Sequence, residues 1–171
     1  SPGLNLSDDG YALTTYQAIF SNPQSITNTF GTWGTNVLGG IWLLIFPNLG
    51  LWGIRLAGAI VSVITIIFVY LTLREYLAKN ILLLGILISW LFTYHFMVVN
   101  VMGYNNISVL FFSIAIWLIS GGLKNNNLSL LFLAGFILSL NVFVRLPNVL
   151  GFSMVFVIAL NAYLKRSVGI K

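Results

Sequence analysis

Residues 51–70 read LWGIRLAGAIVSVITIIFVY, and their only charged side chain is Arg55. A helix needs roughly 20 predominantly apolar residues to cross the hydrocarbon core of a bilayer, which is about 30 Å thick. This stretch satisfies both the length and the composition of such a helix. We therefore predict a membrane-spanning helix at residues 51–70 and build the rest of the fold around it.

The composition extends this prediction to the whole chain. Of its 171 residues, 58% are apolar and only 6% are charged, against roughly 25% charged in an ordinary soluble domain. So few charges could not cover the surface of a water-soluble globule, and the many aromatic and branched apolar residues exclude intrinsic disorder. The absence of Cys excludes disulfides, thiolate metal sites and a Cys nucleophile. The chain is predicted to be a polytopic membrane protein.

Four further apolar stretches follow the first, at residues 81–102, 107–123, 128–144 and 149–164. Short connections join them, so consecutive helices must alternate in direction. An earlier stretch, residues 37–46, would be only about 15 Å long as a helix and is followed by Pro47. We expect a re-entrant or interfacial helix there, the alternative being one kinked span through Pro47. The predicted fold class is all-α, a polytopic transmembrane helix bundle with about five spans.

The first residues of the chain predict an outer amphipathic juxtamembrane helix. Ser7 is a suitable N-cap, and Asp8 and Asp9 would occupy the first turn, where the macrodipole favours carboxylates. The apolar stripe would comprise Ala12, Leu13, Tyr16, Ile19 and Phe20, and the residues facing away from it would be Thr14, Thr15 and Gln17. We divide the chain into an outer loop, residues 1–35, and a transmembrane region, residues 36–171. Since the chain opens on Ser1 rather than Met, we expect it to be part of a longer membrane domain.

The few charged residues predict an orientation. With alternating helices, one side of the membrane receives six of the eight cations: Arg74, Lys79, Lys124, Lys165, Arg166 and Lys171. The positive-inside rule assigns that side to the cytoplasm. The outer side then receives Asp8, Asp9, Arg55 and Arg145. The net charge of +5 reflects topology, and no basic groove with aromatic residues predicts nucleic-acid binding.

Polar residues gather at the predicted outer side. Helical rise puts Arg55 and Arg145 about 28 and 26 Å from the cytoplasmic ends of their spans, and His95 about 22 Å. The same layer contains Asn100, Tyr104, Asn105, Asn106, Asn141 and Asn148. Charged groups near hydrocarbon usually face a partner or a watery cavity, and guanidinium binds phosphate bidentately. The two Arg therefore indicate an anion: the loop carboxylates, a lipid headgroup or a phosphate-bearing substrate.

Structural roles are open alternatives for each of these residues. An Arg at the end of a span commonly extends to the headgroups with no further role. His95 suits a buried, hydrogen-bonded packing position, and Asp8 and Asp9 suit a helix start. One His and two adjacent carboxylates are few ligands for a metal site, so we predict no cofactor and keep a divalent cation as an alternative.

Two segments resemble the GT-C superfamily of integral membrane glycosyltransferases. In SDDGYAL, residues 7–13, an acidic pair precedes Gly-Tyr and an amphipathic helix in the first outer loop. The segment AGFILSLNVFVRLPNVL, residues 134–150, is similar to the superfamily's small-residue helix that ends in a basic residue near the outer face. The resemblance is to the protein mannosyltransferases and the bacterial lipid A aminoarabinose transferases. The superfamily often has Lys where this chain has Arg145, and we identify no acceptor-binding element.

The resemblance implies a transferase that uses a polyprenyl-phosphate-linked sugar and works at the outer face of a membrane, the bacterial plasma membrane by our prediction. Asp8 or Asp9 would act as general base on an acceptor hydroxyl, and Arg55 with Arg145 would stabilise the leaving phosphate. The substrate-binding residues would be Arg55, His95, Tyr104, Asn105, Asn106 and Arg145. The alternatives are a transporter or flippase of a lipid-linked substrate, and a membrane acyltransferase in which His95 would be essential.

Overall fold

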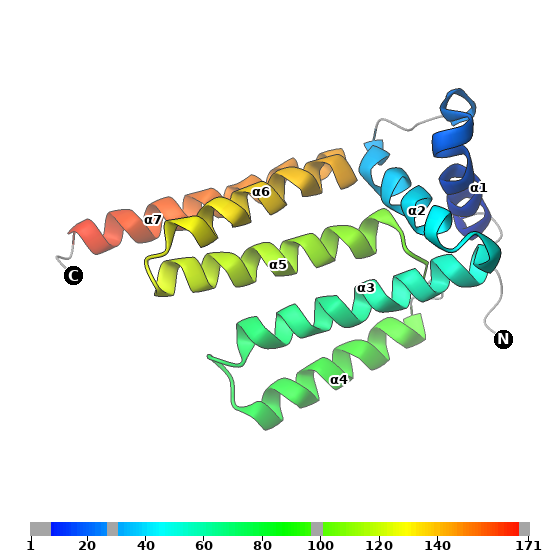
Figure 1. Ribbon diagram of the computed structural model, residues 1–171. Helices are drawn as coiled ribbons and strands as arrows, with labels where there is room; N and C mark the ends of the chain where they lie inside the picture. Colours follow the sequence, from blue (N-terminus) through cyan, green and yellow to red (C-terminus); the bar gives the residue numbers. More distant parts are fainter. Residues whose placement is uncertain (1–7, 27–30, 97–100, 168–171) are drawn as a thin grey trace.

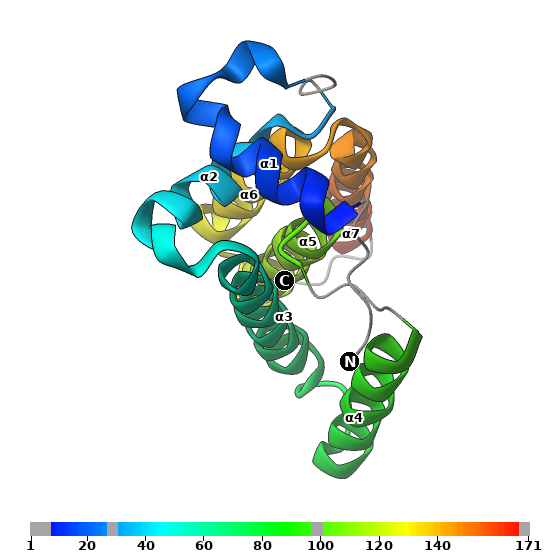
Figure 2. The ribbon, with the colours of Figure 1, turned by 90° about the vertical axis from the view of Figure 1, so that its right-hand side faces the viewer.

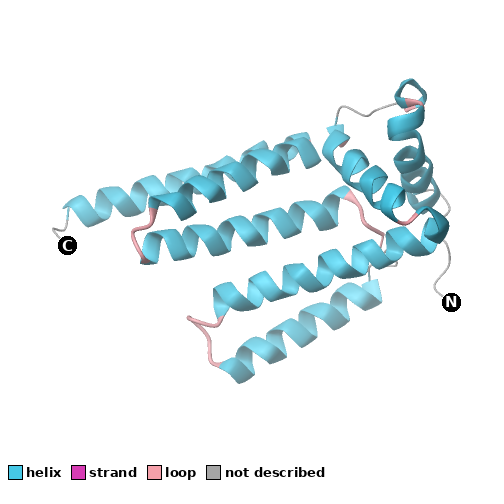
Figure 3. Cartoon of the chain, viewed as in Figure 1, coloured by secondary structure: helices cyan, strands magenta, loops and turns pink. Residues whose placement is uncertain are grey.

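The computed structural model describes residues 8–26, 31–96 and 101–167, without the side chains of residues 8, 9, 90, 92–96 and 165–167. Within these residues every regular element is helical (Figure 3), which confirms the predicted all-α class. The α-helices are α1 (Asp8–Ser21), α2 (Trp33–Ile45), α3 (Gly50–Leu73), α4 (Lys79–Phe96), α5 (Tyr104–Lys124), α6 (Leu128–Val144) and α7 (Met154–Ser167). Short 3-10 helices are η1 (Pro23–Ser25), η3 (Pro47–Leu49) and η4 (Leu146–Ser153).

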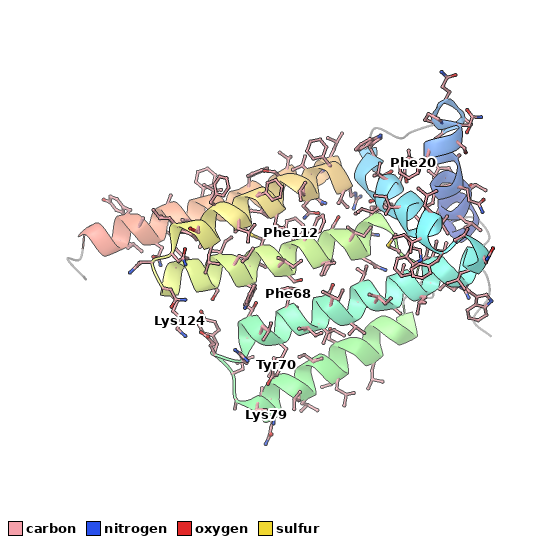
Figure 4. All side chains as sticks on the ribbon, viewed as in Figure 1. Phe20, Phe68, Tyr70, Lys79, Phe112 and Lys124 are labelled. Atoms are coloured by element: carbon pink, nitrogen blue, oxygen red, sulfur yellow. The ribbon has the colours of Figure 1, made fainter. Side chains whose placement is uncertain are left out.

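Helices α3 to α7 run along a common direction, and α1 and α2 cross one end of them (Figure 1). Figure 2 looks onto that end, where α1 and α2 cover α5 and α6 while α4 lies to one side. Lys79 and Lys124 lie at the opposite end from Phe20 (Figure 4). There Lys124 Nζ donates to Glu75 Oε2 at 2.7 Å and holds the pKa of that carboxyl below its usual value. Which side of a membrane this end faces remains a prediction.

Three helical segments are long and apolar enough to cross a membrane: Pro47–Leu73, Tyr104–Lys124 and Leu146–Leu164. They contain the predicted spans at residues 51–70, 107–123 and 149–164. Helix α6 has the predicted bounds but only 17 residues. The predicted span at residues 81–102 corresponds only in part to α4, because residues 101 and 102 are not helical and residues 97–100 lie outside the described chain. The described helices thus support three spans, and the number of about five stays a prediction.

Pro47 separates two helices rather than bending one. Helix α2 ends at Ile45, and Pro47, which has no N–H group, opens η3. Gly50 then turns the chain with a φ of 47°, a conformation that favours glycine. The indole N–H of Trp42 donates to the carbonyl of Gly53 at 2.9 Å, so α2 packs back onto α3. The predicted short helix is confirmed, its depth in a membrane stays a prediction, and the alternative of one kinked span is wrong.

The amphipathic pattern of α1 is confirmed in part. The helix has the predicted extent and Tyr16 is buried, while the predicted N-cap, Ser7, lies outside the described residues. Thr15 was expected to face away from the apolar stripe, and this is wrong because its side chain is only 4% exposed. Its hydroxyl donates to the carbonyl of Tyr11 at 2.7 Å, so the helix itself satisfies the buried group. Phe20, predicted to lie in the stripe, is half exposed.

The start of α2 lies directly against the end of α6, and Gly34 makes this contact possible. A Cβ atom added at Gly34 would lie 2.6 Å from the backbone oxygen of Phe143. At the next position the hydroxyl of Thr35 donates to the carbonyl of Val144 at 3.1 Å. The α1–α2 layer is therefore fixed on the end of the bundle where Arg145 follows α6.

We expect Gly34→Ala to lower the melting temperature of the protein in detergent. The added methyl would collide with a backbone carbonyl that no side-chain rotation can move, and overpacking of this kind costs about 1–3 kcal/mol. Gly135→Ala is the matched control, since nothing lies within 4 Å of its added Cβ, and it should leave the melting temperature unchanged or slightly higher. Equal melting temperatures for the two variants would contradict the close contact.

Candidate functional site

One large cavity extends from the α1–α2 layer along α3 and has a volume of about 1680 Å³. At the α1–α2 layer its walls are polar. The elements that contribute there are α1, the start of α2, the start of α5 and the residue after α6. Their polar side chains on the wall are Tyr11, Tyr16, Thr32, Thr35, Asn36, Tyr104, Asn105, Asn106, Ser108 and Arg145. We call this region the polar end of the cavity.

Between α3 and α4 the same cavity becomes an apolar groove. It follows α3 from Ala59 to Leu73, which is about 21 Å of helix. Ser62 and Thr65 also line it, but their hydroxyls donate to carbonyls of α3 itself at 2.9 and 2.8 Å. Most of the facing side chains from the connecting loop and α4 are apolar: Leu77, Ile81, Leu82 and Ile86. The cavity therefore joins a polar end to a long apolar groove.

Arg145 supplies the positive charge of the polar end. It follows α6 with an extended backbone, at a φ of −157° and a ψ of 124°. Its Nη1 donates to Asn105 Oδ1 at 3.2 Å, and its guanidinium carbon is 4.7 Å from the centroid of the Tyr104 ring. Both contacts direct the guanidinium over the first turn of α5. No carboxylate of the described side chains forms an ion pair with it.

Helix α5 adds a second positive element to the polar end. Gly103 is its N-cap and provides no side-chain cap, so the first N–H groups have no acceptor within the helix. The side chain of Asn106 donates elsewhere, to the carbonyl of Val101 at 2.9 Å. The start of a helix carries roughly half a positive charge and readily binds phosphate or carboxylate. With Arg145 beside it, this end of the cavity has the electrostatics of an anion site.

Three residues, which we call the Asn clasp, hold the chain on both sides of Arg145: Ser108, Asn141 and Asn148. The Asn148 amide nitrogen donates to Ser108 Oγ at 2.7 Å and to both the carbonyl and Oδ1 of Asn141 at 3.0 Å. Asn141 is fully buried and donates to the carbonyl of Ser108 at 3.3 Å. Backbone bonds from Arg145 to Asn141 and from Asn148 to Arg145, at 3.2 and 2.9 Å, complete the corner. The clasp therefore fixes the position from which the Arg145 side chain extends.

Tyr16 places α1 at the cavity. Its hydroxyl donates to the carbonyl of Met102 at 2.5 Å, and the Met102 N–H donates to the carbonyl of Ile54 at 3.0 Å. Burial raises the pKa of the Tyr16 phenol, so the group stays a protonated donor at physiological pH. These bonds join α1, the segment before α5 and the first turns of α3.

The structure brings together four of the eight predicted site residues. Those that line the cavity are Tyr104, Asn105, Asn106 and Arg145. Arg55, in the second turn of α3, is not among the described residues on the cavity wall. Asp8 and Asp9 begin α1 and His95 lies in the last turn of α4, but their side chains lie outside the description, as does all of Asn100. The roles of these residues stay predictions.

The sequence interpretation missed the contributions of α1 and α2 to the cavity wall. The boundary predicted between the outer loop and the transmembrane region falls between Thr35 and Asn36, and Tyr16 is predicted only as part of an apolar stripe. The available signal was a pair of adjacent polar residues at the start of a short helix that is otherwise apolar. Such a pair indicates a special environment, but the sequence does not reveal which groups it meets.

Metal binding has little support among the described side chains. They contain no group of three or more His, Cys, Asp or Glu that could hold an ion. The side chains of Asp8, Asp9 and His95 are not among the described ones, so the divalent cation considered from the sequence stays an alternative.

A protein-family model matches most of the chain. It is described as dolichyl-phosphate-mannose-protein mannosyltransferase, and it matches residues 35–169. The matched region includes both sides of the apolar groove, the Asn clasp, the start of α5 and Arg145, and it begins after α1. No curated protein and no solved structure matches the chain.

We expect Asn148→Ala to lower the melting temperature in detergent. The change removes the hydrogen-bond partner of Ser108 and Asn141 in a buried setting, and leaving such groups unsatisfied costs about 1–3 kcal/mol. Asn48→Ala, in the exposed η3, is the control and should unfold at the wild-type temperature. If Asn148→Ala also unfolds at the wild-type temperature, the clasp does not hold the corner.

Proposed function

We propose that this chain, which belongs to the dolichyl-phosphate-mannose-protein mannosyltransferase family, moves a sugar from a polyprenyl-phosphate donor to an acceptor hydroxyl at the outer face of the membrane. The family is one of membrane glycosyltransferases, and its description names an isoprenoid phosphate-linked mannose and a protein acceptor. Which sugar and which acceptor this chain uses are left open in the proposal.

The main support for the proposal is the match between the polarity along the cavity and the polarity along a polyprenyl-phosphate sugar. A polyprenyl-phosphate sugar has a long apolar tail, an anionic phosphate and a polar sugar in that order. The groove along α3 and α4 offers about 21 Å of mostly apolar wall for the tail. The polar end offers hydrogen-bonding side chains for the phosphate and the sugar. The order of the walls matches the order of the groups in such a donor.

Arg145 and the start of α5 are the proposed phosphate site. Asn105 accepts one of the five guanidinium N–H donors of Arg145, which leaves others for phosphate oxygens. The uncapped N–H groups of α5 add donors beside it. When the bond between the sugar C1 and the phosphate oxygen breaks, the negative charge on the leaving phosphate increases. Fixed positive groups at that position therefore stabilise the transition state more than the ground state.

Asp8 is the proposed general base. Positions 8, 11 and 12 lie on one face of α1, since residues three and four apart are neighbours on a helix. Tyr11 and Ala12, three and four residues after Asp8, both line the cavity, whereas of the residues three and four after Asp9 only Ala12 does. The Asp8 carboxylate would take the proton of the acceptor hydroxyl while the hydroxyl oxygen forms a bond to the sugar C1. The bond from C1 to the phosphate oxygen breaks at the same time, and the lipid phosphate leaves with the bonding electrons. Attack opposite to the leaving group inverts the configuration at C1.

The alternatives have less support. A transporter or flippase would hold its substrate near the middle of the membrane, whereas the polar wall of this cavity lies at one end of the bundle. An acyltransferase that depends on His95 would not require an acidic residue at the start of α1. Membership of a glycosyltransferase family favours sugar transfer over both.

We expect Asp8→Asn to lower the rate of sugar transfer by about 10²–10⁴-fold, the range typical of general-base catalysis. The assay would follow release of polyprenyl phosphate from a radiolabelled donor in proteoliposomes. Asp9→Asn, the matched control with the same change of charge, should keep most of the activity. Full activity in both variants would overturn the assignment of the base.

We expect Arg145→Gln to weaken binding of polyprenyl phosphate by at least about tenfold, because a charged hydrogen bond contributes roughly 1.5–3 kcal/mol. Arg145→Lys should restore only part of the affinity, since an ammonium group lacks the planar fork. Arg55→Gln tests the second predicted phosphate ligand and should have the smaller effect, and Arg74→Gln at the opposite end should have none. Equal losses for the Arg145 and Arg74 variants would contradict the phosphate site.

A further inference from the structure

Asn36 differs from the other buried polar side chains of the described chain. Those less than a tenth exposed are Thr15, Thr35, Asn36, Ser108, Ser113 and Asn141. Five of them have a hydrogen-bond partner within the protein. The carboxamide of Asn36, only 7% exposed, forms no hydrogen bond to any described residue, and it lines the polar end of the cavity. Burying an amide without a partner costs stability, and a ligand that hydrogen-bonds to this amide in the cavity would offset that cost.

The position of Asn36 is adjacent to the proposed phosphate site. Its neighbour Thr35 is hydrogen-bonded to the carbonyl of Val144, the residue before Arg145. Asn36 and Arg145 therefore lie on walls of the polar end that are joined directly to each other. In a lipid-phosphate sugar the group covalently next to the phosphate is the sugar.

The chemistry of a carboxamide also favours a sugar over the phosphate itself. The amide has an oxygen that only accepts hydrogen bonds and a nitrogen that donates two. A phosphate anion has no donor for the amide oxygen, whereas each sugar hydroxyl both donates and accepts. We propose that Asn36 binds hydroxyl groups of the transferred sugar and thereby selects which sugar-bearing donor the enzyme accepts. This inference rests on the proposed function.

Binding by the full chain in lipid nanodiscs tests the proposal without an acceptor. The probes are polyprenyl-phosphate mannose, polyprenyl-phosphate glucose and bare polyprenyl phosphate. The wild-type protein should prefer one sugar-bearing lipid to the bare lipid by about tenfold or more. Asn36→Leu, which keeps the branching at Cγ, should lose that preference and still bind the bare lipid as the wild type does, because Arg145 is intact. Asn48→Leu, exposed in η3, is the control that keeps the preference.

The stability of the free protein provides a second readout. Asn36→Leu removes a buried amide that has no partner among the described residues, so its melting temperature should equal or exceed that of the wild type. Asn141→Leu removes an amide that is hydrogen-bonded to Ser108 and Asn148, and its melting temperature should fall. If Asn36→Leu failed to fold, Asn36→Ala would serve for the binding measurement.

Several results would overturn the proposal. An Asn36→Leu protein that keeps the wild-type preference shows that the amide does not bind the sugar. Equal loss of the bare and sugar-bearing lipids assigns Asn36 to the phosphate or to folding, and a melting temperature as low as that of Asn141→Leu shows that the amide has a partner in the free protein. If the wild type binds none of the three lipids, the proposed function itself fails.

Discussion

The geometry of the polar end of the cavity depends on the hydrogen bonds at the corner between α6 and η4, because they fix the position of Arg145. A helix that ends leaves its last carbonyls without partners in the helix, and such groups are costly when they are buried unpaired. At the end of α6, side chains donate the hydrogen bonds that these carbonyls would otherwise lack. Asn148 donates to the carbonyl of Asn141, and Thr35, from α2, donates to the carbonyl of Val144. The helix can therefore stop within the protein, and the residue at the stop, Arg145, takes an extended backbone that directs its side chain across the start of α5.

The polar end and the apolar groove of the cavity differ in the interactions that hold their walls in place. Long-range side-chain bonds converge on the polar end, from Tyr16 to Met102 and from Thr35 to Val144. A site held in this way keeps its donors in place while charge develops, which is the requirement for electrostatic catalysis. The groove between α3 and α4 is bounded mainly by apolar side chains, and an added Cβ at Gly85 would meet nothing within 4 Å. Apolar contacts are not directional, so under the proposed function this groove would accept a flexible tail in many conformations while the head is held in one.

Helices α3, α5 and α6 were predictable because each is a long apolar stretch between short polar connections. Helix α6 has the predicted bounds, and the break at Pro47 follows from an amide without an N–H group. Tyr104, Asn105 and Arg145 were predictable as neighbours because short loops and helical rise fix their depth. The burial of Thr15 was not, since it depends on a hydroxyl that bonds its own helix. Nor was the contribution of α2, which reaches the site only because Gly34 lets its backbone approach Phe143.

Asn36 and Asn141 show why the chemistry of a residue type does not reveal its role. Both are asparagines within helices of mostly apolar residues, and both are buried. Asn141 meets Ser108 and Asn148, so its burial stabilises the fold. Among the described residues the Asn36 carboxamide has no hydrogen-bond partner and lines the cavity, so its burial is a cost in the free protein. The low dielectric that makes an unpaired amide costly also strengthens any hydrogen bond that a ligand brings to it. An amide left unpaired beside a cationic site therefore discriminates between ligands by whether they complete its hydrogen bonds, which is the property that a sugar-selecting residue needs.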